Sequence, residues 1–111
     1  MNNRGIFVDS EAFLARFNPK DQYHSQALEV WRSLAESESA TCTTNHVLDE
    51  LATLLARRTS YHFSFLKLTD IYNSEIHIDR PGPQDEKEAL ILFEKYADQE
   101  VTFTDCLSFA P

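Results

Sequence analysis

The stretch GIFVDSEAFLARF, residues 5–17, decides how the N-terminal part of the chain folds. An apolar run over residues 6–8 is typical of a buried strand, and Asp9 follows it directly. Residues 11–17 then predict a short helix, with one apolar side made by Phe13, Leu14 and Phe17. Ligands of open α/β sheets bind beyond the carboxyl ends of the strands, so Asp9 stands where a functional site is expected.

The same alternation of strand and helix continues along the chain. Further strands are predicted at residues 40–43 and 75–78, and residues 101–103 resemble the approach to another. The remaining helices are predicted at residues 22–38, from Thr44 or Asn45 to Arg58, at 61–72, and from Pro83 or Gln84 to about Tyr96. This order predicts a parallel sheet with helices on both faces, which is a three-layer α/β/α fold. In the helix over residues 61–72 we expect one apolar side. It is made by Phe65, Leu68 and Tyr72 in register, with Phe63, Leu66 and Ile71 alongside.

Composition narrows the class of protein. At 111 residues the chain is expected to form one domain, without a signal peptide or a membrane-spanning run, and we therefore expect a cytoplasmic protein. The formal net charge of −8 disfavours a passive nucleic-acid-binding module, because an acidic field repels phosphates. An enzyme that meets phosphates through bound cations remains compatible with that charge. Cys42 and Cys106 lie far apart, and we expect both to be reduced and buried.

Three carboxylates stand at comparable places in the alternating pattern. Asp9 ends the first strand, Glu50 lies early in the helix after the second strand, and Asp105 lies in the first turn of the last helix. Two like charges 4 Å apart repel by roughly 4 kcal/mol at an effective dielectric constant of 20, so a convergent set needs protons or a cation. Oxygen ligands favour Mg²⁺ or Mn²⁺ over Zn²⁺, and such a cation supports phosphoryl transfer.

Each carboxylate also has a structural interpretation. Asp9 could cap a helix or turn, Glu50 could lie on a helix surface, and Asp105 could simply favour the helix dipole. A small α/β domain with purely structural carboxylates therefore remains an alternative. Asp49 diverges from Glu50 by about 100° on a helix, and the apolar neighbours of Glu50 favour it as the inward one. The histidines match no zinc motif, although His46 could approach the acidic site.

The segments IFVDSEAFLARF, TTNHVLDELATLLARR and VTFTDCLSFA resemble the three acidic segments of the PIN domain family. The resemblance covers essentially the whole chain and implies a magnesium- or manganese-dependent endoribonuclease, most often the VapC-type toxin of a toxin–antitoxin pair. It implies that Asp9, Glu50 and Asp105 are the catalytic metal ligands. Polar positions beside the site are also carried over from the family, and they are Thr104, Ser10 and Asn45.

The chain departs from the family pattern at its C-terminal end. Family members usually continue with a fourth strand that carries another acidic residue, in the sheet order 3-2-1-4-5. We therefore expect a single domain over residues 1–111 that lacks the usual C-terminal strand and helix, with the sheet order 3-2-1 and residues 6–8 on an edge. An apolar edge strand favours association, so we expect a homodimer or higher homo-oligomer.

The expected partners are an RNA substrate and an antitoxin protein, and no membrane. The alternative function is a truncated, non-catalytic PIN-like domain that binds an antitoxin or self-associates. Arg57 and Arg58 could meet RNA phosphates or an acidic antitoxin segment, but a solvated helix end is the favoured interpretation.

Overall fold

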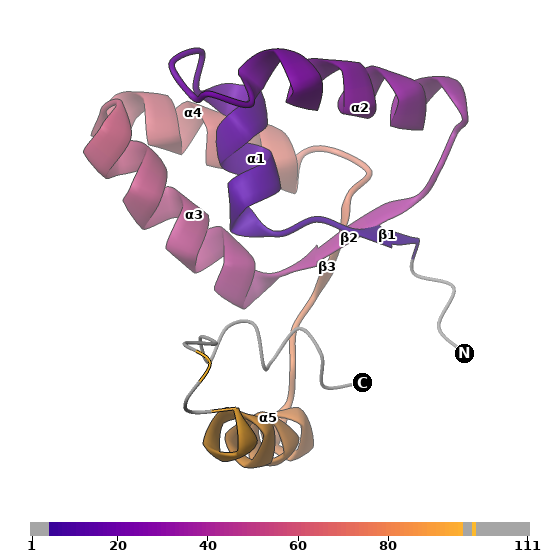
Figure 1. Ribbon diagram of the computed structural model, residues 1–111, viewed down its shortest axis with the longest axis vertical. Coiled ribbons are helices and arrows are strands. Elements are labelled where there is room, and N and C mark those ends of the chain that lie inside the picture. Colours follow the sequence, from indigo (N-terminus) through magenta and orange to yellow (C-terminus); the bar gives the residue numbers. More distant parts are fainter. Residues whose placement is uncertain (1–4, 97–98, 100–111) are drawn as a thin grey trace. The chain divides into compact units, whose positions relative to one another are not determined.

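The computed structural model describes residues 5–96 and 99 of the chain. The described residues divide into a unit that ends at Ile78 and a second unit that begins at Asp79. The elements, in chain order, are β1 (Ile6–Phe7), α1 (Ser10–Phe17), α2 (His24–Glu36), β2 (Thr41–Thr44), α3 (Asn45–Arg58), α4 (Tyr61–Tyr72), β3 (His77–Asp79) and α5 (Pro83–Lys95) (Figure 1).

The strands form one sheet in the order β1-β2-β3, which confirms the order predicted from the sequence. β1 and β2 are parallel, with Ile6 opposite Thr41 and Phe7 opposite Cys42. The pairing extends past β1, because the Val8 amide donates to the Cys42 carbonyl at 2.8 Å. The carboxyl ends of β1 and β2 therefore lie side by side.

Gly5 starts β1 in a conformation that requires glycine. Its φ is +88°, and a Cβ atom at this position would overlap the carbonyl group of Ala40. This close approach allows the amide of the next residue, Ile6, to donate a hydrogen bond to the Ala40 carbonyl at 2.8 Å. Glycine populates positive φ without steric cost, so Gly5 permits this close approach of the two segments.

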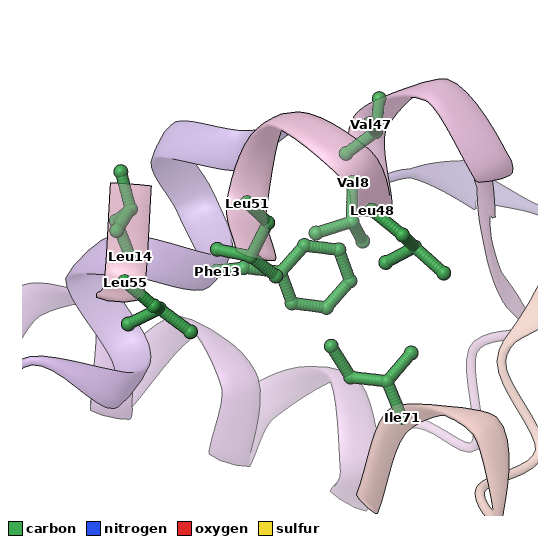
Figure 2. Close-up of a cluster of buried hydrophobic side chains, with 8 residues drawn as sticks. All are labelled: Val8, Phe13, Leu14, Val47, Leu48, Leu51, Leu55 and Ile71. Carbon is green, nitrogen blue, oxygen red and sulfur yellow. The ribbon is translucent and has the colours of Figure 1, made fainter. Parts of the chain in front are cut away.

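The core of the first unit lies between α1, α3 and α4 (Figure 2). α3 contributes one apolar stripe at spacings of three and four residues, and α1 crosses it with Phe13, which is fully buried. The buried cluster comprises Val8, Phe13, Leu14, Val47, Leu48, Leu51, Leu55 and Ile71. This packing fixes α1 against α3 and so fixes the first residues of the two helices relative to each other.

Side-chain caps place the starts of these helices at the ends of the strands. Asp9 caps α1 by accepting from the Ala12 amide at 3.0 Å, and Thr44 caps α3 by accepting from the Val47 amide at 3.1 Å. Of the two caps predicted for α3, the structure therefore uses Thr44. As a result, α1 and α3 both begin at the carboxyl edge of the sheet (Figure 1).

The apolar side predicted for α4 is not its buried side at Phe65 and Tyr72, which are 64% and 51% exposed. Ile71 is the buried apolar residue, and Leu68 is only partly buried. The small side chain of Ser64 faces α3, where its Oγ donates to the Ala52 carbonyl at 2.8 Å. α4 carries apolar residues on several sides, so its pattern alone does not define the buried side. No described helix is both long enough and apolar enough to cross a membrane.

Candidate functional site

Asp9 lies at the carboxyl end of β1, as predicted, and its side chain is exposed. Its Oδ1 accepts the hydrogen bond that caps α1. Within the described residues no hydrogen bond uses Oδ2, so this oxygen can still accept a hydrogen bond or bind a cation. The cap therefore holds the carboxylate in one orientation and leaves half of its acceptor capacity unused.

Glu50 is brought to the same place by Ser10. Ser10 is the first residue of α1 and is 6% exposed, and its Oγ donates a hydrogen bond to Oε1 of the half-buried Glu50 on α3. Because Ser10 directly follows Asp9, this contact ties Glu50 to the residue after Asp9 at the carboxyl edge of the sheet. Asp49, the neighbouring acid, is exposed, which agrees with the interpretation that Glu50 faces inward.

Asn45 adds a further oxygen at this edge. It is the first residue of α3, and its Oδ1 is buried with no hydrogen-bond partner among the described residues. A buried acceptor without a donor costs about 1–3 kcal/mol, so such an atom marks a place where a donor or cation is needed. Amide carbonyl and carboxylate oxygens are the ligands of hard cations such as Mg²⁺ and Mn²⁺. The oxygen atoms of Asp9, Glu50 and Asn45 are thus of the chemical type that such an ion binds.

The third predicted carboxylate, Asp105, and its neighbour Thr104 lie outside the described residues. Residues 5–96 and 99 contain no group of three or more His, Cys, Asp or Glu side chains that could hold a metal ion. Of the three predicted carboxylates, the described part of the chain therefore contains Asp9 and Glu50. His46 forms no hydrogen bond with either of them in this part of the chain.

Two cavities that are not lined by Asp9 or Glu50 were not anticipated from the sequence. The first, of about 450 Å³, lies between α1, α2 and α4 and contains Arg16, Lys67 and Asp70. Burial lowers the pKa of Arg16, and Asp70 offsets part of that effect. The guanidinium of Arg16 lies 4.4 Å from the centroid of the Trp31 ring, which compensates a desolvated cation.

The second cavity, of about 410 Å³, lies where α1 and α3 end and α4 begins. Its lining includes Lys20, Arg58, Thr59 and Ser60. A signal for this site was present in the sequence, because a Pro-Lys pair ends the first helix and an Arg-Arg pair ends the third. Local sequence does not show that these two ends meet, because the contact depends on how α1 packs on α3.

Comparison with known proteins gives a consistent result. The PIN domain family matches residues 6–110. The 23S rRNA-specific endonuclease VapC20 of Mycobacterium tuberculosis, from strains CDC 1551 and H37Rv, is 29% identical over 105 residues, which cover 95% of this chain and 78% of the relative. The crystal structure of M. tuberculosis VapC20, described as a sarcin-ricin loop cleaving toxin, matches with a TM-score of 0.85 at 28% identity, again over 95% and 78% of the two chains. The predicted α/β fold of this type is confirmed.

Proposed function

The chain belongs to the PIN domain family, and we propose that it is a divalent-metal-dependent endoribonuclease of the VapC type that hydrolyses RNA phosphodiesters. The observation that supports this most directly is the hydrogen bond from Ser10 to Glu50. It joins the carboxylate of α3 to the residue next to Asp9, at the edge of the sheet where α/β enzymes bind ligands.

In this proposal Asp9, Glu50 and Asp105 hold Mg²⁺ or Mn²⁺, and the polar residues Ser10, Asn45 and Thr104 support them. When bound, such a cation makes a water molecule more acidic and neutralises charge on the phosphate. Ser10 restrains Oε1 of Glu50, and the helix cap restrains Oδ1 of Asp9. Both carboxylates thus keep one oxygen for the site, and one of the carboxylates accepts the proton that the attacking water loses.

We also propose an antitoxin protein as the partner that restrains this activity, and self-association of the chain. The similarity to VapC20 supports the first, and β1 at the edge of the described sheet supports the second. The named target of the relative, 23S rRNA, suggests a structured ribosomal RNA loop as a substrate to test.

The test is cleavage of a fluorogenic single-stranded RNA and of a ribosomal RNA hairpin, with Mn²⁺, with Mg²⁺ and with EDTA. Asp9→Asn is the sharpest variant, because asparagine caps a helix about as well as aspartate, so the charge is removed while α1 keeps its cap. Glu50→Gln and Asp105→Asn complete the set. Glu29→Gln, at an exposed position of α2, is the matched control.

We expect metal-dependent cleavage by the parent and by Glu29→Gln, and a loss of at least 100-fold in each of the three site variants, consistent with removal of a metal ligand. Full activity in Asp9→Asn would refute the assignment of the site. Absence of cleavage by the parent under every condition would favour a domain that only binds partners.

A further inference from the structure

Basic side chains are concentrated at the end of the first unit that lies away from Asp9 and Glu50. The chain has ten Lys and Arg residues against 18 Asp and Glu. Four of these ten basic residues line the two cavities described above. A fifth, Arg57, directly precedes the lining residue Arg58 in the sequence. We call the four lining residues the cationic rim, and they are Arg16, Lys20, Arg58 and Lys67.

The two cavities of the cationic rim adjoin each other. Pro19 and Phe63 contribute to the lining of both, so the cavities are two parts of one depression across the ends of α1 and α3 and the start of α4. Their linings hold four cationic side chains and a single carboxylate, that of Asp70. The two linings together therefore carry a positive formal charge, on a chain whose net charge is strongly negative.

Half of these cations are available to a ligand. Lys67 is paired with Asp70 at 3.8 Å and Arg16 lies over Trp31, but Lys20 and Arg58 are exposed and form no ion pair within the described residues. An exposed cation without a partner can bind an anion without breaking an existing contact. The free charge is thus focused in the second cavity, beside the hydroxyls of Thr59 and Ser60.

The distance from this cavity to the carboxylates suits a nucleic-acid strand. Glu50 and Arg58 are separated by eight residues of α3, which is about 12 Å along the helix axis. Phosphates follow one another at about 3.4 Å along the axis of one strand of a DNA duplex, so about 12 Å corresponds to three or four phosphates of a strand that is stacked in a similar way. A strand with one phosphodiester at the carboxylates could therefore place another phosphate at Arg58 and Lys20.

We propose that the cationic rim is a second RNA-binding subsite, in which Lys20 and Arg58 bind a backbone phosphate of the substrate about three to four nucleotides from the cleaved bond. This inference rests on the proposed function, and it reverses the interpretation of Arg58 as a solvated helix end. It resolves the difficulty that net charge posed, because a strongly acidic chain binds RNA only where cations are concentrated. An acidic protein segment is the competing occupant. The spacing between carboxylates and rim favours RNA, because both sites then bind one continuous ligand.

The test compares Lys20→Gln/Arg58→Gln with Arg32→Gln/Lys87→Gln, which removes two exposed cations from outside the rim. Both pairs are made in the full chain carrying Asp9→Asn, with EDTA present, so that no RNA is cut. Binding of a fluorescent single-stranded RNA of about 20 nucleotides is followed by anisotropy between 50 and 300 mM KCl. Binding of labelled poly-glutamate is measured in parallel, and circular dichroism checks that each variant is folded.

We expect the rim pair to bind RNA about tenfold more weakly at 100 mM KCl. The slope of log affinity against log salt concentration should fall in magnitude by about 0.7, because Lys20 and Arg58 share one phosphate and each lost phosphate contact removes about 0.7 for a single strand. The control pair should retain the parent affinity and slope. Equal RNA binding by the rim pair and the parent would overturn the proposal. So would a selective loss of poly-glutamate binding, which would assign the rim to an acidic protein partner.

The outcomes separate this inference from the proposed function. Metal-dependent cleavage by the chain with Asp9 intact, together with unchanged RNA binding by the rim pair, would reject the subsite and leave the nuclease in place. RNA binding that depends on Lys20 and Arg58, in a chain that never cleaves, would keep the subsite and reject the catalytic assignment.

Discussion

The Oγ of Ser10, at the start of α1, donates a hydrogen bond to Oε1 of Glu50 on α3, across 40 residues of sequence. Ser10 is buried and Glu50 is half-buried, so the contact is shielded from competing water. It links Glu50 to the first residue of α1, which directly follows Asp9. The first two predictions test what this link does.

Ser10→Ala should weaken the binding of Mn²⁺. Without the hydroxyl, the carboxylate of Glu50 loses the donor that holds it, and removal of such an outer partner typically costs 10- to 100-fold in metal affinity. We expect a loss of about tenfold and a decrease of about 1 kcal/mol in the free energy of unfolding. Isothermal titration with Mn²⁺ and urea denaturation measure the two effects. Ser37→Ala, at an exposed position, is the control, and equal Mn²⁺ affinity in Ser10→Ala would show that the contact does not position a ligand.

Mn²⁺ should stabilise the folded chain, and EDTA should remove that effect. An ion that binds only the folded state adds about 2.7 kcal/mol to the free energy of unfolding at 100 times its dissociation constant. The parent and Glu29→Gln should show this rise in thermal or urea denaturation. Asp9→Asn and Glu50→Gln should not, because each lacks one proposed ligand. If Mn²⁺ does not change the free energy of unfolding of the parent, the proposed metal site is wrong, and this result needs no measurement of RNA cleavage.

Gly5→Ala should destabilise the fold by about 2 kcal/mol or more. A side chain at φ +88° is strained by about 1–2 kcal/mol, and the added Cβ would also overlap the Ala40 carbonyl. Gly82→Ala is a matched control, because a Cβ at Gly82 meets nothing within 4 Å and its φ is −92°. There we expect a loss of less than about 1 kcal/mol, because Gly82 is the N-cap of α5 and glycine suits an N-cap better than alanine. Urea denaturation of both variants checks the contrast.

Phe7→Lys should reduce self-association. β1 lies at the edge of the described sheet, and Phe7 is 42% exposed, so a lysine there places a charge on an edge that would otherwise pair with another chain. Light scattering after size exclusion should show a smaller species for Phe7→Lys than for the parent. Tyr61→Lys is the comparison, because Tyr61 is 86% exposed on α4. If only Tyr61→Lys dissociates the oligomer, the contact runs through α4 and not through the edge of β1.

The sequence alone determined the type and order of the elements. Local periodicity located α4 at Tyr61–Tyr72 and the strands to within a few residues, since the spacing of apolar residues follows from helix and strand geometry. The sequence also placed Asp9 at the end of β1. It favoured Glu50 over Asp49 as the inward-facing acid, because consecutive residues of a helix point about 100° apart. The assignment of Asp105 stays a prediction from sequence.

Only the tertiary structure decided what meets across the fold. The contact of Ser10 with Glu50 and the convergence of Lys20 with Arg58 depend on how α1 packs on α3. No local pattern encodes that packing, because it follows from the shapes of Phe13, Leu51 and their neighbours in the core. The apolar side predicted for α4 differed from its buried side for the same reason. Its residues are apolar on several sides, and the contact of Ser64 with α3 selects one of them.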